Sequence, residues 1–85
     1  MRTSPEFIAL RVNRPGFNDE SLQSMLIVGG EHVHKQTGVD PWAEGGPPLL
    51  RTAAFFFALY LHENSAEEKQ ALRTNIHLLC DGYRS

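Results

Sequence analysis

The most regular pattern of apolar residues in the chain lies between Asn18 and Thr37. Its small or apolar residues recur at spacings of three and four, the period of one face of an α-helix. They are Leu22, Met25, Leu26, Gly29, Val33 and Thr37. Asn18 or Asp19 is a suitable N-cap residue, and Gly38 suits the position just past a helix end. The pattern predicts a helix from Asn18 to about Thr37.

Two adjacent glycines stand inside this predicted helix. Gly29 and Gly30 each cost about 1 kcal/mol relative to alanine in a helix interior, so their presence requires compensation. We expect another backbone to approach the helix closely at this point. The alternative is a local kink.

The most apolar segment follows a loop that is rich in proline and glycine, Val39 to Pro48. From Pro48 to Leu61 nearly every residue is apolar, which predicts a helix at the centre of the fold. Phe55, Phe56 and Phe57 follow one another at about 100° per residue, so they cover about 200° of its surface. Either other helices cover this one on several sides, or one phenylalanine faces a neighbouring subunit.

Two further helices are predicted at the ends of the chain. Ser4-Pro5-Glu6 begins a segment of one or two helical turns, with a strand as the alternative. Ser65 and Glu68 form a capping-box pattern, and Leu72, Ile76 and Leu79 share one face of the helix that follows. The predicted fold is all-α, one domain over residues 1–85: a small bundle of three main helices plus a short N-terminal helix, with residues 82–85 extended.

Composition narrows the classes of function. The chain has 85 residues, 41% of them hydrophobic, and a net charge of −2. An acidic balance argues against a protein that coats DNA. A single cysteine, Cys80, excludes an internal disulfide framework and a zinc site built from several cysteines. The apolar run from Leu49 to Leu61 is too short to span a membrane.

No catalytic or metal-binding constellation is visible. His32 and His34 are two residues apart on a helix, so they point in different directions. His77 and Cys80 are suitably spaced, but two ligands do not complete a metal site. The chain carries no nucleophile motif and no phosphate-binding loop. We therefore expect no enzymatic activity, no metal and no cofactor.

The order of motifs resembles that of the head–tail connector proteins of long-tailed phages. Residues 18–27 resemble the acidic start of the family's first long helix, and Thr37-Gly38 resembles its end. The closest stretch is 47–64, where two prolines precede an apolar helix that ends in His62-Glu63-Asn64. Tyr83-Arg84 resembles the family's closing residues. The chain departs from the family at the Gly29-Gly30 pair, where alanines are usual, and in its shorter loop.

The resemblance implies a structural virion protein in the neck, assembled in the host cytoplasm. It would form a homo-oligomeric ring, expected to be a dodecamer, on the portal protein. The ring would extend the channel through which double-stranded DNA passes without specific contacts, and would dock a tail or stopper protein. The alternative is a small phage-encoded helical inhibitor that binds a host protein.

A ring needs two different adhesive faces on each subunit. The candidate residues for the portal interface are Tyr83, Arg84 and Ser85 in the tail, with Trp42 and Pro41 in the loop. The candidate residues for the interface between subunits are Phe55, Phe56, Arg51 and Arg14. Aromatic and arginine side chains are favoured because they contribute most to protein–protein interfaces.

Overall fold

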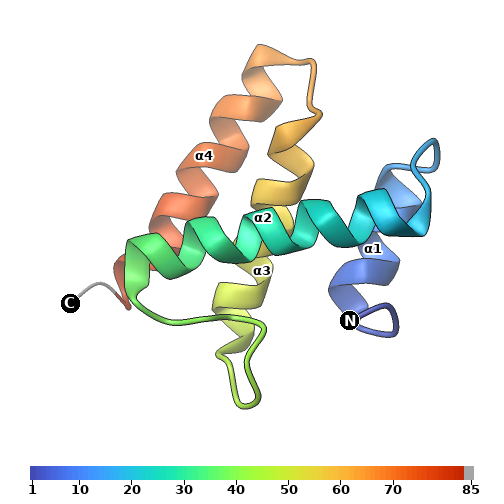
Figure 1. The fold of residues 1–85 in the computed structure, drawn as a ribbon. Coiled ribbons are helices and arrows are strands. Elements are labelled where there is room, and N and C mark those ends of the chain that lie inside the picture. The colour runs from blue at the N-terminus through green and yellow to red at the C-terminus, as the bar shows by residue number, and fades with distance from the viewer. Residues whose placement is uncertain (84–85) are drawn as a thin grey trace.

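A computed structural model describes residues 1–83, and these residues form four helices (Figure 1). The helices are α1 (Pro5–Asn13), α2 (Asp19–Thr37), α3 (Pro48–Leu61) and α4 (Ala66–Asp81). The all-α prediction is confirmed, and the alternative of a strand in the first segment is wrong. Within the described residues no strand occurs.

The helices pack into a flat molecule of 37 × 31 × 16 Å. α3 and α4 form an antiparallel hairpin, α2 crosses it, and α1 lies beside α3 on the side away from α4 (Figure 1). α3 contacts each of the other three helices, so its predicted central position is confirmed. Such a thin arrangement cannot cover α3 completely, and Leu49 in its first turn remains 53% exposed.

Side-chain caps explain where three of the helices begin. A free backbone N–H in the first turn needs an acceptor, and a preceding Ser or Asn supplies one. The acceptors are Ser4 for Phe7, Asn18 for Ser21 and Ser65 for Glu68. Only half of the predicted capping box of α4 is formed. The Ser65 hydroxyl accepts from the Glu68 N–H, but the Ser65 N–H donates to the carboxylate of Glu63 and not to that of Glu68.

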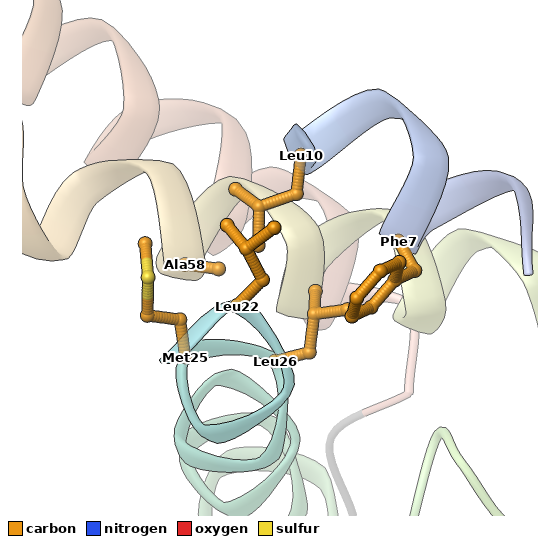
Figure 2. Close-up of a cluster of buried hydrophobic side chains, with 6 residues drawn as sticks. All are labelled: Phe7, Leu10, Leu22, Met25, Leu26 and Ala58. Atoms are coloured by element: carbon orange, nitrogen blue, oxygen red, sulfur yellow. The ribbon is translucent and has the colours of Figure 1, made fainter. Parts of the chain in front are cut away.

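One apolar cluster joins α1 to α2 and α3. Figure 2 shows Phe7 and Leu10 of α1 facing Leu22, Met25 and Leu26 of α2, with Ala58 of α3 beside them. At 5% exposure or less, all six side chains are removed from water. This cluster secures α1, whose nine residues are too few to hold a helix in isolation.

A second cluster joins α2, α3 and α4. Its buried members are Val33, Leu50, Ala53, Ala54, Ile76 and Cys80. Leu72 and Leu79 are half-buried on the predicted face of α4, while Glu67, Lys69, Gln70 and Arg73 are exposed. The helical stripes predicted for α2 and α4 therefore both face the interior.

The two central glycines of α2 permit two different close approaches. A Cβ atom at Gly29 would collide with the backbone carbonyl of Ala54, so α2 and α3 cross at this residue. The expectation of an approaching backbone is confirmed here. A Cβ atom at Gly30 would collide with the indole of Trp42. The space beside Gly30 is thus taken by a side chain and not by a backbone.

Gly82 and Tyr83 form a turn, where an extended tail over residues 82–85 was expected. Gly82 has right-handed helical dihedrals, and the Tyr83 N–H donates to the Cys80 carbonyl at 3.0 Å. The chain therefore makes one further turn, over Gly82 and Tyr83, beyond the end of α4. The proposed tail residues Arg84 and Ser85 lie outside the described residues.

Candidate functional site

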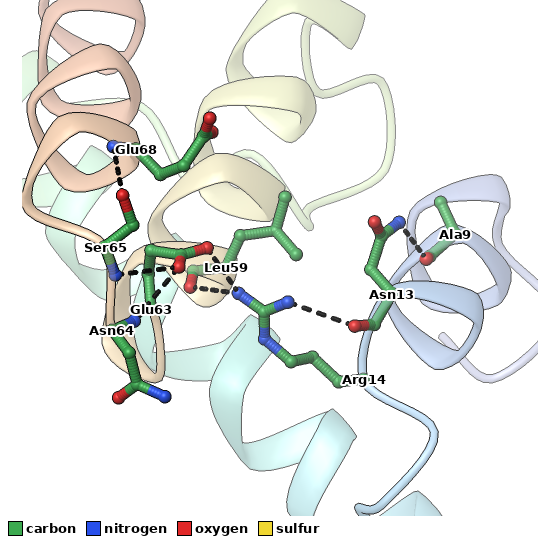
Figure 3. A network of polar contacts seen from close by, with 8 residues as sticks. All are labelled: Ala9, Asn13, Arg14, Leu59, Glu63, Asn64, Ser65 and Glu68. Carbon is green, nitrogen blue, oxygen red and sulfur yellow. Dashed lines mark hydrogen bonds and ion pairs between the residues drawn. The ribbon is translucent and has the colours of Figure 1, made fainter.

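Arg14 acts inside the chain as a clamp between α1 and α3 (Figure 3). One terminal nitrogen of its guanidinium donates to the Leu59 carbonyl at 2.8 Å and lies 3.4 Å from Glu63 Oε2. The last carbonyls of a helix lack partners within the helix and carry partial negative charge. The last turn of α3 contains no basic residue of its own. Arg14, predicted as a contact between subunits, supplies the missing cation from the end of α1.

Glu63 gathers three contacts at the start of the α3–α4 turn. Its Oε1 accepts the Asn64 and Ser65 N–H groups at 3.0 and 3.1 Å, and its Oε2 faces Arg14 (Figure 3). The Ser65 hydrogen bond lowers the pKa of Glu63 below its usual range, and the bond from Asn64 and the charge of Arg14 add to this effect. Partial burial opposes the shift. The ionised form is therefore favoured in the folded chain.

Arg51 also makes contacts within the chain. It donates to the Gly46 carbonyl at 2.8 Å, and its Nε lies 3.3 Å from Glu6 Oε1. This arginine therefore holds the start of α3 to the loop before it and to the first turn of α1. A role for Arg51 between subunits remains a prediction, and it would have to use the part of the side chain that is still exposed.

The loop residues proposed for the portal interface pack inward. The Trp42 indole N–H donates to the Leu26 carbonyl at 2.9 Å, and the ring contacts both apolar clusters. Pro41 is fully buried. A contact of Pro41 with the portal stays a prediction, and it would require this residue to become exposed on assembly. Trp42 is half-buried, and its role at a portal interface stays a prediction.

The remaining candidates are partly exposed aromatic residues. Phe55 packs against the first cluster and Phe56 against the second, with their ring centroids 5.8 Å apart. Tyr83 packs against the second cluster. Each of the three is half-buried, so part of every ring can still reach a partner. Their roles at an interface stay predictions.

An open groove of about 700 Å³ lies where α2 passes the α3–α4 hairpin. We call it the α2–α4 groove, and its lining includes His32, Phe57, Tyr60, Arg73, His77 and Leu78. The imidazole of His32 stacks on Phe57 with ring centroids 4.2 Å apart. None of the described lining residues is Asp or Glu, although the chain contains ten such residues. Asp81 lies next to the lining, 3.8 Å from His77.

Aliphatic side chains are also exposed on separate parts of the surface. Val12 and Ile8 of α1 are 74% and 50% exposed, and Leu78 of α4 is 63% exposed. Ile27 and Val28 lie together on α2 at 41% and 42%. Single exposed aliphatic residues are ordinary on a protein surface, whereas neighbouring ones such as Ile27 and Val28 form a patch that a partner can cover.

Metal binding and membrane insertion find no support in residues 1–83. These residues contain no group of three or more His, Cys, Asp or Glu side chains that could hold a metal ion. No helix among them is both long enough and apolar enough to cross a membrane.

Comparison of the chain with family models, curated proteins and solved structures finds no match. The candidate surfaces therefore rest on geometry and on the order of motifs in the sequence. Sequence reasoning missed the α2–α4 groove, because its lining comes from three helices. The exposure of Ile27 and Val28 could have been found, since both fall outside the predicted buried stripe of α2.

Proposed function

We propose that the chain is a structural adaptor of the head–tail connector type, which forms a ring on the portal of a phage particle. Its motif order from Asn18 to Tyr83 supports this reading, as does the all-helical fold. The observation that carries most weight is the position of the exposed aliphatic residues. Some of them lie on α1 (Ile8 and Val12) and on α4 (Leu78), two helices that make no contact with each other and flank α3 on opposite sides (Figure 1).

A closed ring is built from head-to-tail contacts between two unlike surfaces. The α1 edge offers Ile8 and Val12, and the α4 edge offers Leu78. Pairing the α1 edge of one subunit with the α4 edge of the next would remove these side chains from water. The net charge of −2 suits a channel along which DNA must slide without being gripped.

Quantitative mass spectrometry of purified phage particles from the source tests this function. We expect the chain in particles at about one copy per portal subunit, as matching closed rings require. Absence of the chain from particles would refute the adaptor and favour the small inhibitor of a host protein.

A pair of variants sharpens the test. Val12→Arg places a charge on the α1 edge and should reduce incorporation into particles by at least tenfold, because a buried unpaired charge is strongly unfavourable at an interface. Val28→Arg changes another exposed valine, away from both edges, and should leave incorporation unchanged. Equal incorporation of the two variants would contradict the edge-to-edge arrangement.

A further inference from the structure

The outward face of α2 carries an exposed stripe with acidic ends. We call this the outer stripe, and it comprises Glu20, Ser24, Ile27, Val28 and Glu31. The spacings place these residues on one side of the helix, opposite the buried stripe that faces α3. Two adjacent aliphatic side chains between carboxylates form a surface that water solvates poorly at its centre. One turn beyond it lies Lys35.

The α2–α4 groove combines basic and aromatic residues, which complement the carboxylates and aliphatic side chains of the outer stripe. Arg73 and the two imidazoles of His32 and His77 line it, and the rings of Phe57 and Tyr60 provide apolar surface. The ammonium group of Lys69 lies 5.5 Å from the centre of the Tyr60 ring and adds a cation at the rim. Such a groove fits a helix face that presents aliphatic residues with carboxylates on either side.

We propose that the outer stripe of a second copy of this chain occupies the α2–α4 groove. The groove adjoins α2, because His32 of α2 lines it together with residues of the α3–α4 hairpin that α2 crosses. Stripe and groove therefore adjoin, and two copies placed face to face can exchange both contacts around one two-fold axis. The broad face measures 37 × 31 Å, which can supply the roughly 800 Å² per partner of a standard interface.

Charge decides between the outer stripe and the other exposed aliphatic surface. Arg11, between Ile8 and Val12 on α1, is paired with Asp19 at 3.2 Å, so the α1 edge brings no unpaired carboxylate to Arg73 of the groove. The outer stripe brings Glu20 and Glu31 instead. The face-to-face dimer thus uses neither residue of the α1 edge. It does cover Leu78, which lines the groove and is also the α4 edge of the proposed ring, so the dimer is an assembly of the free chain that excludes the ring contact at this residue.

Sedimentation of the purified chain over a range of concentrations up to about 1 mM, where even weak association is populated, tests the dimer. We expect a species of twice the 9.6 kDa of one chain. Val28→Arg should weaken the dimer at least tenfold, since it turns a cation towards the groove. Val12→Arg, the matched control on α1, should leave it unchanged. Circular dichroism verifies that both variants remain folded.

A charge exchange tests the partner surfaces directly. Arg73→Glu alone and the double variant Glu20→Lys/Glu31→Lys alone should each dissociate the dimer. An equimolar mixture of the two should regain dimers as mixed pairs, detected by native mass spectrometry, because each groove again faces a stripe of opposite charge. A wild-type chain that stays monomeric, a mixture without mixed pairs, or a dimer lost only in Val12→Arg would overturn the proposal. Particle incorporation is measured separately, so failure of the dimer leaves the adaptor function undecided and the reverse also holds.

Discussion

α3 is held on its two sides by opposite kinds of residue. Towards α1 the contact depends on long polar side chains, since Arg14 reaches the Leu59 carbonyl and Arg51 reaches Glu6. Towards α2 the contact depends on the absence of a side chain, because Gly29 lets the helix backbone meet Ala54. The short helix α1 can offer only a small apolar face, so directed polar contacts complete its attachment. The longer helix α2 gains enough from close packing alone.

The largest loss of stability should come from adding a side chain at Gly29, where α2 meets α3. Gly29→Ala places a Cβ atom against the Ala54 carbonyl, which cannot move without separating the two helices. Overpacking costs about 1–3 kcal/mol and occasionally more, and a collision with a backbone carbonyl places this variant at the upper end of about 3 kcal/mol. The gain in helix propensity of about 1 kcal/mol offsets part of this cost. We expect the free energy of unfolding in urea to fall by about 2 kcal/mol. Gly16→Ala is the control, since nothing lies within 4 Å of its added Cβ. Equal stability of the two variants would show that α2 and α3 do not depend on this approach.

A smaller loss of stability should follow from removing the polar contact that Arg14 makes between α1 and α3. Arg14→Ala removes the partner of the Leu59 carbonyl and leaves the half-buried carboxylate of Glu63 without its cation. Leaving such groups unpaired costs about 1–3 kcal/mol, and we expect about 1.5 kcal/mol because water can reach part of the site. Arg11→Ala is the matched control, since its ion pair with Asp19 is about half exposed and contributes little. If both arginine variants unfold at the same urea concentration, the Arg14 clamp is not a stabilising contact.

The smallest effect is expected on the pH dependence of stability in acid, through Glu63. The pKa of Glu63 is lowered in the folded chain, so its contribution to stability is complete above its ordinary pKa of 4.5. It is lost as the pH falls from there through the lower folded value, because protonation removes the charge that Arg14 and the backbone N–H groups contact. Glu63→Gln should flatten the fall in unfolding free energy below pH 4.5 relative to wild type. Glu67→Gln, at an exposed position of α4, serves as the control. An equal flattening in this variant would show that the loss of stability in acid does not depend on Glu63.

The fold could be predicted largely from local pattern. Spacings of three and four placed the buried faces of α2 and α4, and Ser65 with Gly38 marked helix boundaries that the structure contains. The interface candidates were harder, because their chemistry depends on distant residues. Trp42 in a proline-rich loop could face in or out, and only the space beside Gly30 directs it inwards. Arg14 stands 45 positions from Leu59, and no local pattern relates them.

The sequence by itself determined the helices, their order and their buried faces, since hydrophobic period and capping act over a few residues. It also carried the motif order on which the adaptor proposal rests. Only the tertiary structure decided which surplus apolar and basic residues remain available to partners. Arg14, Arg51 and Pro41 are engaged inside the chain, whereas Val12, Val28 and Leu78 are exposed. The reason is physical: exposure depends on what the rest of the chain places against a residue, and that is set by contacts between helices far apart in sequence.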